Sequence, residues 1–174
     1  MPKLGCWSQY GWSCADGNGR VRISQYVYFD LSSDVVTADS ITSFLGIQPD
    51  ETKVRGSRRA EPPIPTRHHW SVRCREPGLC VDDQITVVLD RIEAVRAKIL
   101  DLISGGEVFA RLEIVRNFDD ESGEEEVLDS FVTPGGGIAE KLPGQHQLLG
   151  WILSAEQVAI LASMRATIDA DEYG

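Results

Sequence analysis

The sequence has no apolar run that could span a bilayer, because its longest mostly apolar stretches are about ten residues and a spanning helix needs about 20. Residues 1–12 contain one lysine and no apolar core like that of a secretory signal peptide. Basic residues are also few, with 17 Lys and Arg against 27 Asp and Glu, whereas duplex binding depends on cations that neutralise phosphates. We therefore predict a cytoplasmic protein that binds neither membranes nor duplex nucleic acid.

The spacing of the cysteines does not favour metal binding. The four cysteines are Cys6, Cys14, Cys74 and Cys80. Their spacings, C-x7-C and C-x5-C, differ from the C-x2-C pairs of structural zinc sites. The sequence also lacks a P-loop and a dinucleotide-binding fingerprint. We expect reduced thiols and no metal or cofactor. The alternative is a metal held by the four cysteines together, or by two of them with His68 or His69.

The rest of the composition is that of an ordinary globular protein, with 174 residues of which 42% are hydrophobic and 25% charged. A chain of this length buries roughly two-thirds of its unfolded surface in a single domain. Residues 1–19 show no helical or strand periodicity, so we predict a flexible or loosely packed leader there. Residues 20–174 are predicted to form one domain, with an acidic and glycine-rich insertion at about 119–144.

The hydrophobic pattern predicts strands and helices in alternation. Alternate residues from Val21 to Leu31 are apolar, which is typical of a strand with one buried face. Apolar residues recur with helical spacing from about Asp82 to Ser104 and predict one helix roughly 34 Å long, at about 1.5 Å per residue. Short helices are predicted after the caps Thr37 and Ser154. The other predicted strands are Thr52–Gly56, His69–Cys74, Glu107–Phe118, Leu148–Leu153 and Thr167–Tyr173.

This order, β-α-β-β-α-β-β-α-β, predicts an α+β fold: a mainly antiparallel sheet with helices packed on one face. Short motifs also resemble a known family. The first helix ends in Leu45-Gly46-Ile47-Gln48-Pro49, and a later strand contains His69-Trp70-Ser71-Val72. Together with the long helix and the C-terminal Ile168–Tyr173, they resemble the bacterial proteins grouped as domain of unknown function 4279, over roughly residues 23–174. The resemblance implies a bacterial, cytosolic α+β domain, and no catalytic residue because the family has no established activity.

The charges are concentrated in two segments. The basic segment, residues 53–75, holds seven of the 17 basic residues and only one acid, Glu61, so it carries +6 in a protein of net charge −10. The acidic segment, residues 119–129, contains Asp119, Asp120, Glu121, Glu124, Glu125, Glu126 and Asp129. Like charges this close repel one another, and an oppositely charged partner would offset that cost. The alternative is that both segments are solvated loops.

Our first functional hypothesis is a non-catalytic interaction protein that recognises a protein partner through this segregated charge. Complementary potentials accelerate docking, and small acidic bacterial proteins that neutralise nuclease toxins offer an immunity-like analogy. The candidate partner-binding residues are Asp119, Asp120, Glu121, Glu124, Glu125 and Glu126. These acids lack the EF-hand spacing, so we do not predict a calcium site.

The second hypothesis is a binding module for a small anionic ligand, a nucleotide or phosphate. Guanidinium groups suit bidentate pairing with carboxylate or phosphate, and the turn after Gly56 offers backbone N–H groups. The candidate residues are Arg55, Arg58, Arg59, Arg67, His69 and Arg73. The alternative is internal neutralisation of these arginines by the acidic segment or by Asp169 and Asp171.

The third hypothesis is a hydrolase-type enzyme that uses His69. Histidine changes charge near neutral pH, and Ser71 is expected on the same face of the strand. The sequence identifies no acid to accompany His69, and we assign no catalytic residue from it. This hypothesis requires a pocket that encloses His69 beside a carboxylate.

Overall fold

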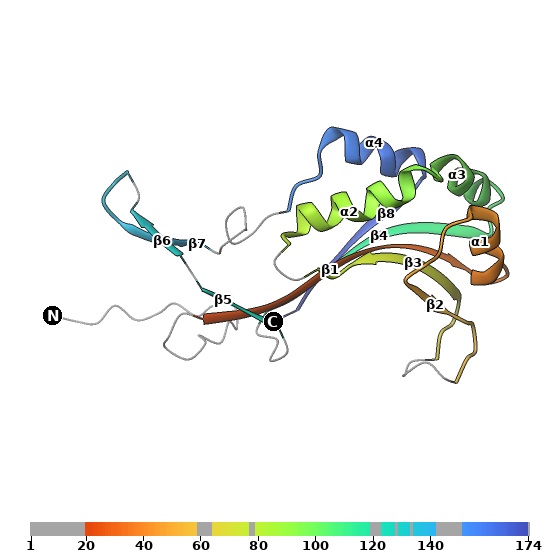
Figure 1. The fold of residues 1–174 in the computed structure, drawn as a ribbon, viewed down its shortest axis with the longest axis horizontal. Coiled ribbons are helices and arrows are strands. Elements are labelled where there is room, and N and C mark those ends of the chain that lie inside the picture. The colour runs from red at the N-terminus through yellow and green to blue at the C-terminus, as the bar shows by residue number, and fades with distance from the viewer. Residues whose placement is uncertain are drawn as a thin grey trace.

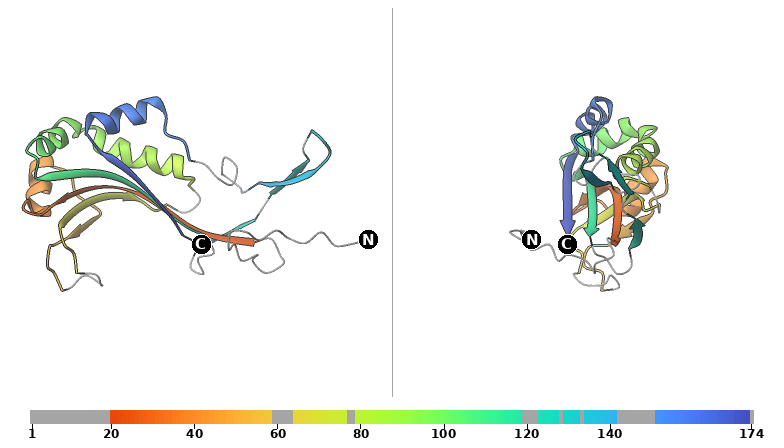
Figure 2. Two further views of the ribbon diagram at one scale, coloured as in Figure 1. Left: turned by 180° about the vertical axis from the view of Figure 1, so that it is seen from behind. Right: turned by 90° about the vertical axis from the view of Figure 1, so that its left-hand side faces the viewer.

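The computed structural model describes residues 20–58, 64–76, 79–118, 123–127, 129–132, 134–141 and 151–173. The predicted leader at residues 1–19 lies outside these ranges. Six strands form one sheet, and helices lie on one side of it (Figure 1 and Figure 2). This arrangement confirms the predicted α+β fold.

The main sheet is mostly antiparallel. Its strands are β1 (Arg20–Ser33), β2 (Glu51–Lys53), β3 (His68–Cys74), β4 (Val108–Phe118), β5 (Glu124–Val127) and β8 (Thr167–Tyr173). Five of them follow the order β2-β3-β1-β4-β8, and β5 pairs with the N-terminal part of β1. Only the β4–β8 pair among these is parallel. The long strand β1 therefore lies at the centre and contacts strands from three other parts of the chain.

Four helices are present in the described part of the chain. They are α1 (Ala38–Leu45), α2 (Val81–Glu93), α3 (Arg96–Ser104) and α4 (Ala155–Ser163). The predicted caps are confirmed: the Thr37 hydroxyl accepts a hydrogen bond from the Ser40 amide, and Ser154 forms a capping box with Gln157. Gly46 ends α1 with a φ of 79°, a left-handed conformation that glycine adopts without steric cost.

The single long helix predicted for Asp82–Ser104 is wrong, because the chain forms α2 and α3 with a break between them. Val95 leaves the helical conformation, with a ψ of 10°, and its amide bonds to the Ile92 carbonyl three residues back at 3.0 Å. Val95 and Ile99 are both buried. The apolar spacing runs through the break without interruption, so the sequence pattern does not reveal it.

Two predictions for the C-terminal part of the chain also need correction. The insertion at 119–144 contains β5 and two further strands that we did not predict, β6 (Asp129–Val132) and β7 (Ile138–Lys141), which form a separate two-stranded sheet. In the predicted strand Leu148–Leu153, residues 151–153 form no strand, and the rest lies outside the described ranges. Instead, the Ile152 amide donates to the Asp82 carboxylate at 2.8 Å, so this segment docks against the first turn of α2.

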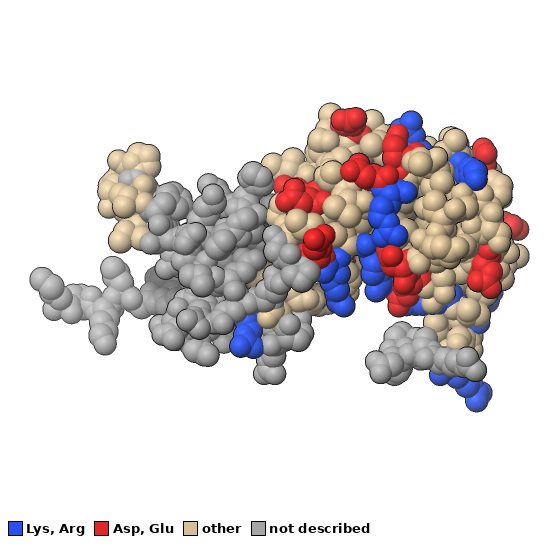
Figure 3. Space-filling model, in the orientation of Figure 1, with Lys and Arg blue, Asp and Glu red and all other residues tan. Residues whose placement is uncertain are grey.

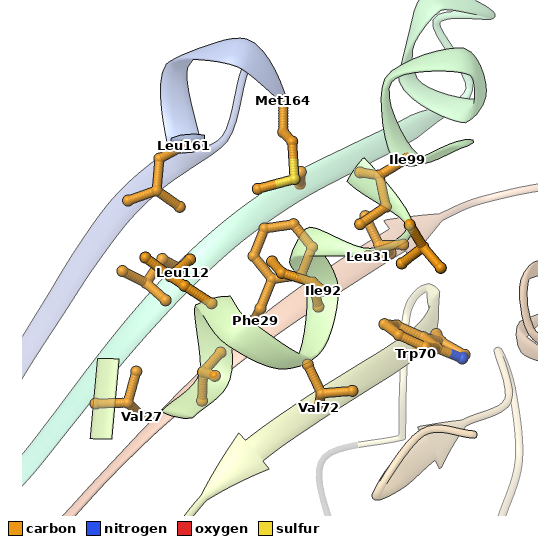
Figure 4. Close-up of a cluster of buried hydrophobic side chains, with 14 of the residues drawn as sticks. Val27, Phe29, Leu31, Trp70, Val72, Ile92, Ile99, Leu112, Leu161 and Met164 are labelled. Atoms are coloured by element: carbon orange, nitrogen blue, oxygen red, sulfur yellow. The ribbon is translucent and has the colours of Figure 1, made fainter. Parts of the chain in front are cut away.

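The core lies between the sheet and the helices (Figure 4). Alternate residues of the three central strands contribute to it, including Val27, Phe29, Leu31, Trp70, Val72 and Leu112. Trp70 is fully buried, and its indole N–H donates to the Thr42 hydroxyl in α1 at 3.1 Å, so its one polar atom is satisfied. None of the helices described is long and apolar enough to cross a membrane.

Candidate anion-binding site

The face of the sheet opposite the helices is polar. Successive side chains of a strand point to opposite faces. The stretch of β1 that supplies Val27 and Phe29 to the core therefore presents Tyr26, Tyr28 and Asp30 on the other face. The helices lie on the core side of the sheet (Figure 1). We call this side of the sheet the open face.

The open face is hollowed into a pocket of about 250 Å³. We call it the open-face pocket, and its walls come from β1, β2, β3 and β4 and from the residue that follows β3. The lining residues are Tyr26, Tyr28, Asp30, Glu51, Lys53, His69, Ser71, Arg73, Arg75 and Arg111. Four are cationic and two are carboxylates, so the lining carries a net charge of +2 with His69 neutral.

A buried carboxylate holds His69 in this pocket. Asp30 is only 3% exposed, and its two carboxylate oxygens lie 3.2 and 3.1 Å from His69 Nδ1. The two residues come from neighbouring strands, where Asp30 lies opposite Ser71 and His69 lies opposite Ser32. The condition set by the third hypothesis, a pocket with His69 beside a carboxylate, is therefore met.

A second charged group lies on the β4 side of the pocket. The Arg111 guanidinium is 2.7 Å from a Glu113 oxygen and 3.2 Å from an Asp169 oxygen in β8. Burial works to lower the pKa of Arg111, but these carboxylates and Tyr28 raise it overall. Burial, together with a hydrogen bond to Glu113, raises the pKa of Tyr28, so its phenol stays protonated throughout the physiological range. The Arg111 guanidinium is thus held in place from two strands.

The β3 side carries two arginines that stack over tyrosines of β1. Arg73 pairs with the Glu51 carboxylate, and its guanidinium lies 5.9 Å from the centre of the Tyr28 ring. Arg75 lies 4.4 Å from the centre of the Tyr26 ring. Each such cation–π contact contributes up to about 1 kcal/mol of stabilisation at an exposed site. The two rings also stack on each other, with centroids 6.1 Å apart.

Two cations of the pocket have no carboxylate partner within the described ranges. They are Lys53, which lies opposite His69 in the β2–β3 pair, and Arg75, just beyond the end of β3. In addition, the buried Nε of Arg73 has no hydrogen-bond partner among the described residues. The open-face pocket therefore offers donors and positive charge that the described protein groups do not use.

An ion pair outside the pocket fixes its β2–β3 edge to the helices. Arg91 in α2 donates to the two carboxylate oxygens of Asp50 at 2.5 and 3.1 Å, and Asp50 also accepts the Arg73 amide at 2.7 Å. Burial works to raise the pKa of Asp50, but the bonds from Arg91 and Arg73 outweigh it and lower the pKa overall. Asp50 thus links α2 to β3 at the position where Arg73 enters the pocket.

Of the six residues predicted for an anion site, five are described, and of these the structure brings His69 and Arg73 into the pocket. Arg55 donates to the Asp34 carbonyl at 2.9 Å, and Arg67 lies 3.5 Å from the Asp34 carboxylate and stacks on Phe109. Arg58 is exposed in the turn after Gly56, and Arg59 lies outside the described ranges. The predicted fork fails because Arg55 and Arg67 turn towards Asp34, at the end of β1.

The sequence reasoning missed five charged residues of the pocket: Asp30, Glu51, Lys53, Arg75 and Arg111. Asp30 and Arg111 occupy polar positions of strands that were correctly predicted, and the alternation alone places them on the open face. The pattern does not predict that β1 pairs with both β3 and β4, and this pairing brings the positions together.

The candidate partner-binding acids are only partly described. Asp119, Asp120 and Glu121 lie outside the described ranges, whereas Glu124, Glu125 and Glu126 belong to β5. There Glu125 lies opposite Arg22 of β1. On the side that Figure 3 shows, basic and acidic groups of the described residues alternate rather than forming two separate regions.

The described residues also bear on the metal alternative. Within the described ranges, no three His, Cys, Asp or Glu side chains are grouped as metal ligands. Cys74 is buried in the core, and the Cys80 thiol donates to the Asp83 carboxylate at 3.1 Å. Burial raises the pKa of the Cys80 thiol, which makes this cysteine a poorer nucleophile. Cys6 and Cys14 lie outside the described ranges.

Comparison with known proteins places this fold in a family. Residues 23–132 match the family model described as Domain of unknown function (DUF4279). The chain belongs to the DUF4279 family. The match begins at residue 23 as predicted but ends at residue 132, whereas we expected it to extend to residue 174. No curated protein and no solved structure matches the chain significantly. All residues that line the open-face pocket lie inside the DUF4279 match.

Proposed function

We propose that this DUF4279 protein binds a small anionic ligand, bearing phosphate or carboxylate, in the open-face pocket. One observation carries the proposal: a pocket of about 250 Å³ is lined by four cationic side chains and only two carboxylates. Two of these cations, Lys53 and Arg75, have no carboxylate partner among the described residues. An anion would supply the missing partner.

The arrangement of the other two cations supports the same proposal. Arg73 is held by Glu51, and Arg111 by Glu113 and Asp169, so both guanidinium groups are positioned before a ligand arrives. Positioned donors lose less conformational entropy on binding. The pocket is slightly smaller than the roughly 300–1,000 Å³ typical of drug-sized ligands, which favours a small metabolite.

The experiment is a binding measurement with three probes: inorganic phosphate, succinate and AMP. Isothermal titration calorimetry on the unmodified protein identifies which probe binds, and thermal unfolding reports the accompanying stabilisation. For that probe, Lys53→Ala combined with Arg75→Ala should weaken binding by about 100-fold or more, because charge-assisted hydrogen bonds contribute about 1.5–3 kcal/mol each.

The matched control is Arg96→Ala. Arg96 is also an exposed arginine, but it lies on α3, where it pairs with Glu93 at 3.3 Å. This variant should bind the probe as the unmodified protein does. If none of the three probes binds, or if the Lys53/Arg75 double variant retains full affinity, the proposal is wrong.

Recognition of a protein partner through segregated charge stays a prediction, with less support than the anion site. That hypothesis was based on the free-energy cost of uncompensated charge in the basic segment. Arg67 lies beside Asp34 and Arg73 pairs with Glu51, so part of that cost is already offset within the chain. Co-purification of a partner that weakens steeply from low to high salt would favour this alternative. A cytoplasmic, bacterial setting is assumed in both cases.

A further inference from the structure

The Asp30–His69 pair gives the open-face pocket a group suited to proton transfer. A carboxylate next to Nδ1 favours the neutral tautomer in which Nδ1–H donates to it, which leaves Nε2 as a proton acceptor. His69 lines the pocket, and its Nε2 has no hydrogen-bond partner within the described ranges. Burying a carboxylate is costly unless it is hydrogen-bonded. Asp30 is 3% exposed and is hydrogen-bonded to this imidazole.

The positive groups around His69 suit a reaction that develops negative charge. Arg111 lies directly opposite Asp30 in the β1–β4 pair, and Lys53 lies opposite His69 in the β2–β3 pair. Arg73 is two residues beyond Ser71 on the same face of β3. Fixed cations aimed at a developing oxyanion are usually the largest contribution to such catalysis.

We infer that the protein hydrolyses a carboxylic ester in the open-face pocket, with His69 as the general base, and that the acyl part of this ester carries a separate anionic group. The inference rests on the proposed function, because this anionic group is what Lys53 and Arg75 would bind. It adds a reaction to the binding site and identifies Asp30 as the acid that the sequence did not reveal.

The reaction uses water as the nucleophile. His69 Nε2 takes a proton from the water molecule while its oxygen forms a bond to the ester carbonyl carbon. The resulting oxyanion lies among the guanidinium groups of Arg73 and Arg111. Collapse of this intermediate breaks the bond between the carbonyl carbon and the alcohol oxygen, and the departing alcohol takes the proton back from His69 Nε2. The products are a carboxylic acid and an alcohol, with no oxidant or further reactant.

Water is favoured over Ser71 as the nucleophile. Ser71 is 4% exposed, and its hydroxyl donates to the Glu51 carbonyl at 3.4 Å rather than to His69. A serine nucleophile requires a hydrogen bond to its base. Asp30 touches neither water nor substrate in this scheme and acts as a positioning residue for His69.

The test compares two activated esters, 4-nitrophenyl succinate and the neutral 4-nitrophenyl acetate, by release of nitrophenolate. The unmodified protein should hydrolyse the succinate ester with the higher kcat/KM. His69→Gln should lower kcat by about 10²- to 10⁴-fold, the usual contribution of a general base, and leave the affinity for free succinate within about twofold. His68→Gln is the matched control, because His68 is the adjacent histidine, does not line the pocket, and accepts the Arg55 amide at 3.2 Å.

Asp30→Asn separates positioning from a structural role. It should lower kcat in the unmodified protein but have little further effect in the His69→Gln background, because no imidazole is left there to position. A variant that is merely less stable would lower the activity in both backgrounds. Succinate that binds without hydrolysis of its ester would overturn the inference and leave the anion site intact. Full activity in His69→Gln would also overturn it, whereas absence of both binding and hydrolysis would reject both proposals.

Discussion

The two faces of the sheet are built from the same strands, yet their side chains make different kinds of interaction. On the covered face, Phe29 and Trp70 are completely buried against the helices, and the interactions there are apolar. On the open face, Tyr28 and Arg73 lie among paired charges and border a pocket. Adjacent residues of one strand, such as Phe29 and Asp30, thus belong to different environments.

This difference indicates which face of the sheet stabilises the fold and which face is suited to ligand binding. Burial of apolar area supplies the main driving force for folding, so the covered face should carry most of the stability. The open face carries ion pairs that are partly exposed, and such pairs contribute little to stability. The side chains of the open face can therefore suit a ligand at little cost to the stability of the fold. The following predictions test this division, from the largest expected effect to the smallest.

Trp70→Ala should cause the largest loss of stability. It removes the largest fully buried side chain and the hydrogen bond to Thr42, and comparable truncations of aromatic residues cost about 3–5 kcal/mol. Urea unfolding followed by circular dichroism measures the free energy of unfolding. A loss below about 1 kcal/mol would show that the covered face does not dominate stability.

Tyr28→Phe should cost about 1 kcal/mol near pH 8, the usual contribution of one hydrogen bond, because it removes the phenol that bonds to Glu113. The raised pKa of Tyr28 gives this cost a pH dependence. Above about pH 10 the unfolded tyrosine ionises while the folded one does not, so the unmodified protein loses stability as the pH rises.

The phenylalanine variant lacks this loss, and the stability difference between the two proteins should shrink between pH 8 and pH 11. Unfolding free energies at the two pH values measure it. A difference that stays constant across this range would contradict the predicted role of burial at Tyr28.

Asp50→Asn should cost less than about 1 kcal/mol, because Asp50 and Arg91 are each more than one-third exposed and solvent screens the pair. The lowered pKa of Asp50 means that its contribution is complete at neutral pH and is lost as the pH falls below about 4. Thermal unfolding of the two proteins should differ less at pH 3 than at pH 7. An equal difference at both values would assign the effect to something other than the ion pair.

Arg75→Ala should have the smallest effect on stability, within about 0.5 kcal/mol, although it removes a cation of the pocket. Among the described residues, the one polar or ring interaction of Arg75 is its stacking on Tyr26. Urea unfolding of this variant, compared with its affinity for the anionic probe, tests the division most directly. A stability loss above about 2 kcal/mol would mean that Arg75 supports the fold rather than a ligand.

Local features of the fold were predictable from sequence, whereas the site was predictable only in part. The caps Thr37 and Ser154 and the covered-face pattern of β1 depend on residues within a few positions of each other, so the chain displays them directly. The break at Val95 was missed because the apolar spacing continues across it. Arg55 and Arg67 were misplaced because their partner, Asp34, lies outside the segment in which we looked for a site.

The sequence by itself determined the α+β class, the caps and which residues of each strand are apolar, because periodicity and capping are local properties. The tertiary structure alone decided that Asp30 meets His69, 39 positions away, and that Lys53, Arg75 and Arg111 share one pocket. Those contacts depend on which strands become neighbours and in what register. A strand's own alternation selects a face but not a partner, so only the folded sheet brings these charges together.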